Sequence, residues 1–233
     1  MIKKKEKIVI SVGGSLIAPN GLDVNFLSGL NDFLRNKIKK NLSWQFFIVT
    51  GGGRVARDYR DAGHAVIGKE LSNDDLDWLG IHATRLNAHL IRTIFRDLAH
   101  PVVIKDYEMI HKAQKPVVVA AGWKPGWSTD YCAVQICEDY GVSRIVNLSN
   151  IDRVYERDPK KYPDAKSFDE ISWANFKKLI GGKWSPGMHA PFDPIASRKA
   201  AKLKLEVAVL RGGDWHNFEN YLIGREFEGT RIF

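Results

Sequence analysis

Two glycine clusters, each directly after a short apolar run, are the residues of this chain best suited to chemistry. Residues 13–15 (Gly-Gly-Ser) follow the apolar run 8–12, and residues 51–54 (Gly-Gly-Gly-Arg) follow the run 46–50. Glycine has no Cβ, so its backbone can turn tightly and approach a ligand closely. A turn of this kind between a strand and a helix directs free N–H groups and the positive end of the helix at one point. Two such turns indicate a long phosphate chain, or two phosphate-bearing ligands that face one another.

A third glycine-containing loop, residues 122–130, follows the apolar run 117–121 and leads into a helical pattern. The hydroxyls of Ser128 and Thr129 and the carboxylate of Asp130 stand where that helix begins. Each loop alone also fits an ordinary turn with a Ser, Thr or Asp helix cap. However, the carboxyl ends of parallel strands share one edge of a sheet. The sequence therefore predicts that the three loops share one cleft.

Other nucleotide-binding and catalytic patterns are absent or misplaced. No G-x-x-x-x-G-K-[ST] occurs, which excludes a P-loop NTPase, and no G-x-S-x-G elbow supports a Ser-His-Asp hydrolase. Residues 51–56 formally match the dinucleotide fingerprint, but that fingerprint follows the first strand and needs an acid at the end of the next one. Here the acids at that distance flank a helix start, so a Rossmann-type oxidoreductase is disfavoured. Cys132 and Cys137 lack metal-ligand spacing, and no metal-binding cluster is predicted.

The composition is that of a globular protein. The chain has 233 residues, 44% of them hydrophobic and 27% charged, enough for one large α/β domain or two small lobes. The net charge of +8 is spread along the chain without an RNA-binding motif, which disfavours polymeric nucleic acid and suits an anionic small molecule. No apolar run approaches the roughly 18 residues that span a bilayer. We expect a cytoplasmic protein without a membrane partner, because the run after the basic N-terminus is too short for a signal peptide.

Short β-rich runs alternate with helical patterns along the chain. The expected strands are residues 7–12, 45–50, 102–105, 117–121, 144–147 and 205–210. The expected helices are residues 25–39, 55–62, 74–97, 129–140 and 195–202. Most of the strands are nearly continuous apolar runs, typical of strands covered on both faces. The alternation predicts an α/β fold, a three-layer αβα sandwich with a mainly parallel central sheet.

The longest expected helix, residues 74–97, carries one apolar stripe. Its members, at steps of three or four, are Leu79, Ala83, Leu86, Leu90 and Ile94. The stripe could serve an interface, but we expect it to face the core.

The loops and their order resemble the amino-acid kinase superfamily, and within it the uridylate kinases of bacteria and archaea. The matching segments are residues 13–15, 51–57 (Gly-Gly-Gly-Arg-x-Ala-Arg), 77–81, 122–130 (Gly-x-x-Pro-Gly-x-Ser-Thr-Asp), 148–160, 193–194 and 229–232. The resemblance implies transfer of phosphate from ATP to UMP by a homo-oligomer, a hexamer built from dimers. It also implies a single domain, residues 1–233, with roughly residues 1–145 as the acceptor and phosphate half and 146–233 as the ATP half.

The resemblance also implies roles for individual residues. On the ATP side, the phosphate cradle and the adenosine pocket would be formed by Gly13, Gly14, Ser15, Gly53, Arg57, Ser149, Tyr155 and Asp158. On the UMP side, contacts would come from Gly52, Asp77, Gly122, Gly126, Ser128 and Thr129. Asp130 would organise the polar centre, and we expect Asp130 and Arg54 to act in catalysis.

The expected reaction suits such a set of residues. In-line phosphoryl transfer needs positioning and charge neutralisation more than covalent help. The acceptor is already a phosphate anion, so no strong general base is required. Glycine-loop donors, an arginine and Mg²⁺ held mainly by the ATP phosphates would suffice, without a metal site of protein ligands.

Several positions depart from the family pattern. Ser11 stands where many members carry a lysine, two residues before the first glycine, which leaves the catalytic cation unassigned. Lys183 is a candidate for that role, although a loop lysine is the simpler interpretation. Trp123, Lys124 and Trp127 replace smaller or polar residues and could reshape the base pocket. Two alternatives therefore stay open: a kinase of the same superfamily with a carboxylate, carbamate or small phosphomonoester as acceptor, and a nucleotide- or oxyanion-binding protein without turnover.

Overall fold

The computed structural model describes residues 5–159, 161–181 and 190–233, and it has the predicted α/β architecture. Its main sheet has seven strands in the order β3-β2-β1-β4-β8-β9-β7. From one edge inward, five strands run parallel to one another: β3 (Val117–Ala120), β2 (Trp44–Thr50), β1 (Glu6–Val12), β4 (Arg144–Ser149) and β8 (Glu206–Arg211). At the far edge, β9 (Thr230–Ile232) is antiparallel to β8, and β7 (Glu170–Ile171) is parallel to β9. The prediction of a mainly parallel sheet is confirmed.

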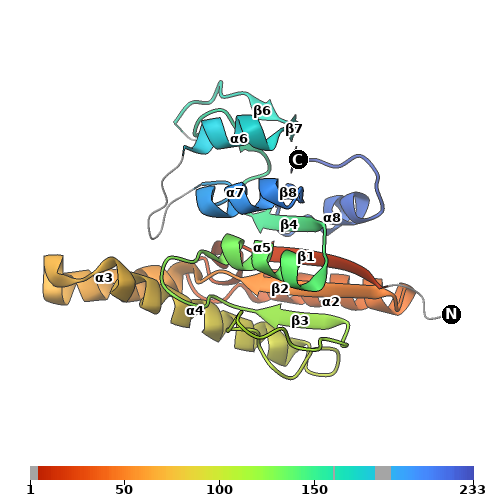
Figure 1. Ribbon diagram of the computed structural model, residues 1–233, viewed down its shortest axis with the longest axis horizontal. Coiled ribbons are helices and arrows are strands. Elements are labelled where there is room, and N and C mark those ends of the chain that lie inside the picture. The colour runs from red at the N-terminus through yellow and green to blue at the C-terminus, as the bar shows by residue number, and fades with distance from the viewer. Residues whose placement is uncertain (1–4, 160, 182–189) are drawn as a thin grey trace.

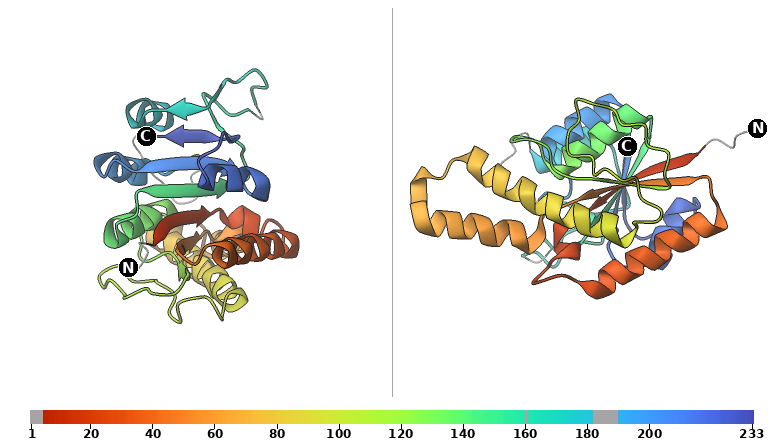
Figure 2. Two further views of the ribbon diagram at one scale, coloured as in Figure 1. Left: turned by 90° about the vertical axis from the view of Figure 1, so that its right-hand side faces the viewer. Right: turned by 90° about the horizontal axis from the view of Figure 1, so that it is seen from below.

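Helices cover both faces of the sheet, which gives the predicted three layers (Figures 1 and 2). One face packs against α2 (Val24–Lys40), α4 (Asn73–Ile94) and α8 (Trp215–Leu222). The other face packs against α5 (Thr129–Tyr140), α6 (Trp173–Ile180) and α7 (Pro194–Lys202). Along β1, Ile8 and Ile10 lie in the first core and Val9 lies in the second. Burial on both faces explains why the strand sequences are apolar at successive positions.

Side-chain caps fix where the helices beside the strand ends begin. Ser128 accepts the backbone N–H of Tyr131 at 3.1 Å, which starts α5. Asp193 accepts the N–H of Ala196 at 2.6 Å, which starts α7. Each cap satisfies a donor that has no partner inside its helix. The caps also hold both helix N-termini at the carboxyl edge of the sheet.

A helical hairpin projects beyond the sheet (Figure 2, right). It consists of α3 (Gly53–Ile67), the 3₁₀ turn η1 (Gly68–Glu70) and α4, which opens with a capping box between Ser72 and Asp75. The first half of α4 packs against α3, while its second half reaches the core of the sheet. None of the helices in the described residues is both long and apolar enough to cross a membrane.

Parts of the predicted arrangement are wrong. Residues 102–105 are not a strand: Ile104 makes one isolated bridge to Ala120, because the chain touches the edge of β3 there and then leaves it. The stripe on α4 is not all core either, since Leu86 is 63% exposed while Ala83 is buried. The buried face of α4 holds small and polar residues, because this helix meets α3 and the glycine turns rather than the sheet alone.

The shortest elements were not predicted. They are α1 (Gly14–Ile17), α6, α8, β5 (Val154–Tyr155), β6 (Ser167–Phe168), β7 and β9. Strands of two or three residues carry no readable alternation, so tertiary contacts decide them.

Candidate active site

The carboxyl ends of β1, β2 and β4 and the loop after β3 meet at one cavity of about 340 Å³. Residues of all three predicted glycine loops line it. Twelve residues for which the sequence predicts a role line the cavity: Gly13, Gly14, Ser15, Gly52, Gly53, Arg57, Asp77, Gly122, Ser128, Thr129, Asp130 and Ser149. The expected convergence of the loops at one edge of the sheet is therefore what the structure has.

The first two glycine turns are in direct contact. A Cβ on Gly14 would lie 2.0 Å from the backbone N of Gly53 and 2.7 Å from that of Gly52, so no other residue type fits there. Gly53 has φ +67°, a conformation that L side chains rarely adopt. Neither α1 nor α3, which begin here, has a side-chain cap. The N–H of Leu16 donates to the carbonyl of Gly13 at 2.9 Å and that of Arg54 to the carbonyl of Ala18 at 2.8 Å. Among the described residues, the N–H groups of Gly14 and Gly53 stay available to an anion.

The turns are fixed to neighbouring strands and helices by hydrogen bonds. The N–H of Gly13 donates to the carbonyl of Leu148 at 2.9 Å, and the N–H of Gly51 donates to that of Val12 at 2.9 Å. Asn87 of α4 donates its Nδ2 to the carbonyl of Gly51 at 2.7 Å. The donors at the cavity are therefore held in place before any ligand binds.

Two carboxyl groups, those of Asp130 and Asp193, lie side by side at the ends of β1 and β4. Ser11 Oγ donates to one oxygen of Asp130 at 3.2 Å, and the backbone N–H of Asp193 donates to the other at 3.0 Å. Burial, and then the neighbouring Asp193 carboxylate, raise the pKa of Asp130 to about 7. Asp130 therefore joins β1, α5 and the start of α7. Its role as organiser of the polar centre stays a prediction.

The arginines near the cavity divide into two groups. Arg57 and Arg60 of α3 line it, whereas Arg54 does not belong to the lining. Arg54 forms an ion pair along the helix with Asp58 at 2.5 Å, on an exposed surface. The expectation that Arg54 acts in catalysis stays a prediction, and Arg57 is better placed. Lys183, the other candidate cation, lies outside the described residues.

The third loop is tied to α4. Asp77 accepts the N–H of Gly126 at 2.7 Å, and Arg85 donates to the carbonyl of Trp123 at 2.8 Å. Gly126 itself, with φ +81°, is absent from the lining, but Trp127 beside it is part of it. The ring of Trp127 lies 4.6 Å from that of Trp123 and 4.4 Å from that of Tyr131, both edge-on. Trp127 is therefore the aromatic residue of the described lining, and Trp123 and Tyr131 pack against it.

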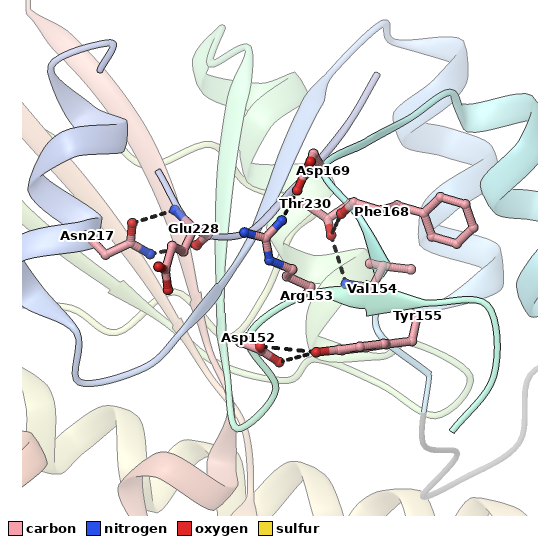
Figure 3. Close-up of polar contacts among 9 residues, drawn as sticks. All are labelled: Asp152, Arg153, Val154, Tyr155, Phe168, Asp169, Asn217, Glu228 and Thr230. Carbon is pink, nitrogen blue, oxygen red and sulfur yellow. Dashed lines mark hydrogen bonds and ion pairs between the residues drawn. The ribbon is translucent and has the colours of Figure 1, made fainter. Parts of the chain in front are cut away.

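Two of the residues expected at the adenosine pocket, Tyr155 and Asp158, are not among the described residues of the cavity wall. The hydroxyl of Tyr155 donates to Asp152 at 3.1 Å (Figure 3). The same segment is fixed by Thr230, whose hydroxyl accepts the N–H of Val154 at 2.8 Å. Arg153, which replaces the usual glycine of the family pattern, pairs with Asp169 (Figure 3). The adenosine contacts of Tyr155 and Asp158 stay predictions.

A divalent cation fits this cavity only if the phosphates of a bound nucleotide supply some of its ligands. No group of three His, Cys, Asp or Glu that could hold a metal occurs in the described part of the chain. However, Oδ2 of Asp193 is buried and has no hydrogen-bond partner among the described residues, in a residue that is 6% exposed and lines the cavity. An unpaired carboxylate oxygen of this kind fits a hydrated or phosphate-bound Mg²⁺.

Sequence reasoning missed several residues of the lining, notably Arg60, Thr84, Asn147 and Asp193 as a cavity carboxylate. A signal existed for Arg60, which follows Arg57 by three residues on one helix and so shares its face. No comparable signal existed for Asn147, a polar residue inside a buried strand.

Comparisons with known proteins agree with this geometry. The family model described as the amino acid kinase family matches residues 6–211. A uridylate kinase of Methanocorpusculum labreanum is 34% identical over 97% of this chain and 95% of its own length. A uridylate kinase of Pyrococcus abyssi is 32% identical over 97% of this chain and 93% of its own length. The crystal structure of a uridylate kinase from Archaeoglobus fulgidus, 27% identical, superposes with a TM-score of 0.80 and covers 98% of this chain and 100% of that one.

Proposed function

Because the chain belongs to the amino acid kinase family, we propose that it transfers the γ-phosphate of ATP to UMP and yields ADP and UDP. The observation that carries the proposal is the single cavity in which glycine turns from β1 and β2, the loop after β3 and two arginines meet. Such a cavity can hold two phosphate-bearing ligands end to end. The names of the near-full-length relatives, uridylate kinases, support uridylate as the acceptor.

The reaction follows from positioning. One oxygen of the UMP phosphate attacks the γ-phosphorus of ATP in line, while the bond to the βγ-bridging oxygen breaks and ADP leaves. Backbone N–H groups at Gly14 and Gly53 bind the ATP phosphates, and Arg57 neutralises charge between donor and acceptor. Asp130 holds Ser11 and the start of α7 in place. The acceptor phosphate is already anionic, so the residues need not remove a proton from it.

A bound Mg²⁺ would neutralise phosphate charge, which is the chemistry it supplies in phosphoryl transfer. We propose that the ATP phosphates hold it, with the carboxylates of Asp130 and Asp193 as the protein groups that face it. This arrangement is in keeping with a protein that offers too few ligands for a cage of its own.

The acceptor follows from the part of the cavity that α4 and the third loop line. Asp77 of α4 and the loop 122–130 form this part, and we propose that Asp77, Gly122, Ser128 and Thr129 contact UMP there. The tryptophans of this loop replace smaller residues, so another small acceptor is the alternative to test first. A binding protein without turnover is the second alternative, since Ser11 replaces a lysine at the end of β1.

A coupled assay of ADP release with each candidate acceptor tests the proposal. We expect Mg-ATP and UMP to give UDP, and other nucleoside monophosphates to react at least about 10-fold more slowly, since one lost polar contact in a closed pocket has an effect of this size. The assay should include CMP, AMP, dTMP, carbamate and acetate. Turnover with one of these and none with UMP would assign a different acceptor, and no turnover with any would favour the binding protein.

We further propose that the protein is a homo-oligomer, a hexamer by family resemblance, and that the α3–α4 hairpin takes part in the contact. Large apolar side chains are exposed there, including Val66, Ile67, Trp78 and Leu86, at 83%, 46%, 42% and 63%. Exposed apolar side chains gathered on one projecting element are typical of an interface.

Light scattering coupled to gel filtration checks this assembly. We expect Leu86→Glu to shift the protein to a smaller species, because the substitution would bury a charge in the contact. Leu42→Glu, at a position 79% exposed outside the hairpin, should leave the mass unchanged. An unchanged mass for Leu86→Glu, or a monomeric wild type, would remove the hairpin from any interface.

The two functional halves, roughly residues 1–145 and 146–233, and a cytoplasmic location stay predictions. The division into two halves is supported by the positions of the lining residues: Asp77 and the loop 122–130 precede residue 145, and Ser149 follows it.

A further inference from the structure

Arg60 lies one helical turn after Arg57 on α3, and both side chains line the cavity. Resting on the function proposed above, we propose that Arg60 is a second phosphate-binding arginine, which holds the phosphate of the acceptor together with Arg57. Residues three apart on a helix are neighbours on its surface, about 4.5 Å apart along the axis. Two planar guanidinium groups at this spacing can both donate to one phosphate.

Contacts with α4 determine the position of the Arg60 side chain. It crosses α4 at Gly80, where a Cβ would lie 2.2 Å from Nη2 and 3.1 Å from Cζ of Arg60. Its Nε donates to the carbonyl of Leu76 at 3.0 Å, which fixes the guanidinium over α4. Glycine weakens the interior of a helix relative to alanine. Gly80 therefore makes room for the guanidinium at a cost to the stability of α4.

The terminal nitrogens of Arg60 are free to bind an anion. Among the described residues neither has a hydrogen-bond partner, since only Nε is engaged. Partial burial lowers the pKa of Arg60, and the carboxylate of Asp77 opposes this shift through its charge. A partly dehydrated cation with unused N–H groups binds a phosphate more strongly than a fully hydrated one does.

The charges around the cavity show why one arginine would be insufficient. In the described lining the cationic side chains are Arg57 and Arg60, while Asp77, Asp130 and Asp193 are carboxyl groups. The phosphates of ATP and of the acceptor repel each other, and Ser11 contributes no charge at the end of β1. Arg60 lies farther than Arg57 from the glycine turn that opens α3, on the side of Asp77 and Gly80. This side faces the acceptor, so the acceptor phosphate is its ligand.

Binding of UMP and of uridine to the full chain without ATP separates a phosphate contact from a nucleoside contact. Calorimetry would measure UMP, and competition against UMP would measure uridine. We expect Arg60→Gln to weaken UMP binding by about 10- to 100-fold, the usual effect of losing hydrogen bonds to a charged group. Uridine affinity and the KM for ATP should stay within a factor of about three, and Arg60→Lys should recover part of the loss. Arg96→Gln, an exposed arginine beyond the end of α4, is the matched control and should bind UMP normally.

Gly80→Ala is the second variant, and it leaves Arg60 in the sequence. The new Cβ displaces the guanidinium, so we expect weaker UMP binding with a Tm equal to the wild-type value or about 2–4 °C above it. In an Arg60→Gln background, Gly80→Ala should weaken UMP binding no further. This non-additivity would show that the glycine acts through the arginine.

The possible outcomes separate this inference from the proposed function. Unchanged UMP affinity in Arg60→Gln overturns the inference, and so does an equal loss for uridine and UMP, which would assign Arg60 to the nucleoside. Wild-type protein that neither binds nor phosphorylates UMP would instead reject the proposed function. Wild-type turnover of UMP with an unimpaired Arg60→Gln would reject the role of Arg60 alone.

Discussion

Gly14→Ala is expected to lower kcat/KM by at least about 100-fold, because displacing reacting groups by about 1 Å can have an effect of this size. The added Cβ would lie 2.0 Å from the backbone N of Gly53 and 2.7 Å from the carbonyl carbon of Gly51. Backbone atoms cannot rotate away as a side-chain end can, so the two glycine turns must separate. Overpacking of this kind destabilises proteins by about 1–3 kcal/mol. Steady-state kinetics and urea unfolding of the same preparation would measure both effects.

Gly63→Ala is the matched control for this substitution. Gly63 lies on α3, and its Cβ would meet only the flexible ends of two leucines, Leu71 at 3.1 Å and Leu79 at 3.7 Å. We expect unchanged activity and a stability equal to or up to about 1 kcal/mol above that of the wild type, since alanine favours helix more than glycine does. Full activity in Gly14→Ala would mean that contact between the turns has no part in catalysis.

Asp130→Asn is expected to bind ATP nearly as well as the wild type while kcat falls by about 100- to 1,000-fold, the usual effect of losing one preorganised polar group. Both oxygens of Asp130 accept hydrogen bonds, one from Ser11 and one from the backbone N–H of Asp193. An amide offers one acceptor oxygen and must turn its NH₂ group toward one of these donors. The start of α7 and the end of β1 then lose their common anchor. Equilibrium titration with ATP and single-turnover kinetics would separate binding from transfer.

The same variant has a characteristic pH dependence of stability. The pKa of Asp130 is raised to about 7 in the folded protein from 3.8, so folding takes up a proton between these values. The stability from this group is fully present below pH 4 and is lost as the pH rises through about 7. Asn cannot titrate, so the Tm of Asp130→Asn relative to the wild type should rise from pH 5 to pH 8.5. A difference in Tm that is constant over this range would contradict the raised pKa.

The sequence was sufficient for the central elements of the fold because their patterns are long and local. Residues 45–50 are apolar at nearly every position, and the strand that they predict is β2. Residues 129–140 follow a serine cap and coincide with α5. By contrast, residues 102–105 are equally apolar but pair only once with β3, and nothing local distinguishes an isolated bridge from a strand.

The candidate site could be predicted where the backbone determines it. Gly14 and Gly53 line the cavity because glycine is needed for the close approach of the two turns. The direction in which a side chain points was harder to predict from the sequence. Arg54 and Arg57 are alike in sequence, but Arg54 turns along the helix to Asp58 while Arg57 faces the cavity. The role of Gly80 in admitting Arg60 depends on how α3 crosses α4, which no local pattern encodes.

Binding of a bisubstrate analogue, with adenosine and uridine joined through their 5′ carbons by a chain of five phosphates, tests the shared cleft most directly. We predict that one molecule binds per chain, more tightly than ATP or UMP alone, and that it competes with both, because the three loops line one cavity. Calorimetry gives the stoichiometry and the affinity, and displacement by each nucleotide gives the competition. Two results would place donor and acceptor at separate sites and contradict the proposed transfer. One is that only ATP or only UMP displaces the analogue, and the other is that two molecules of the analogue bind per chain.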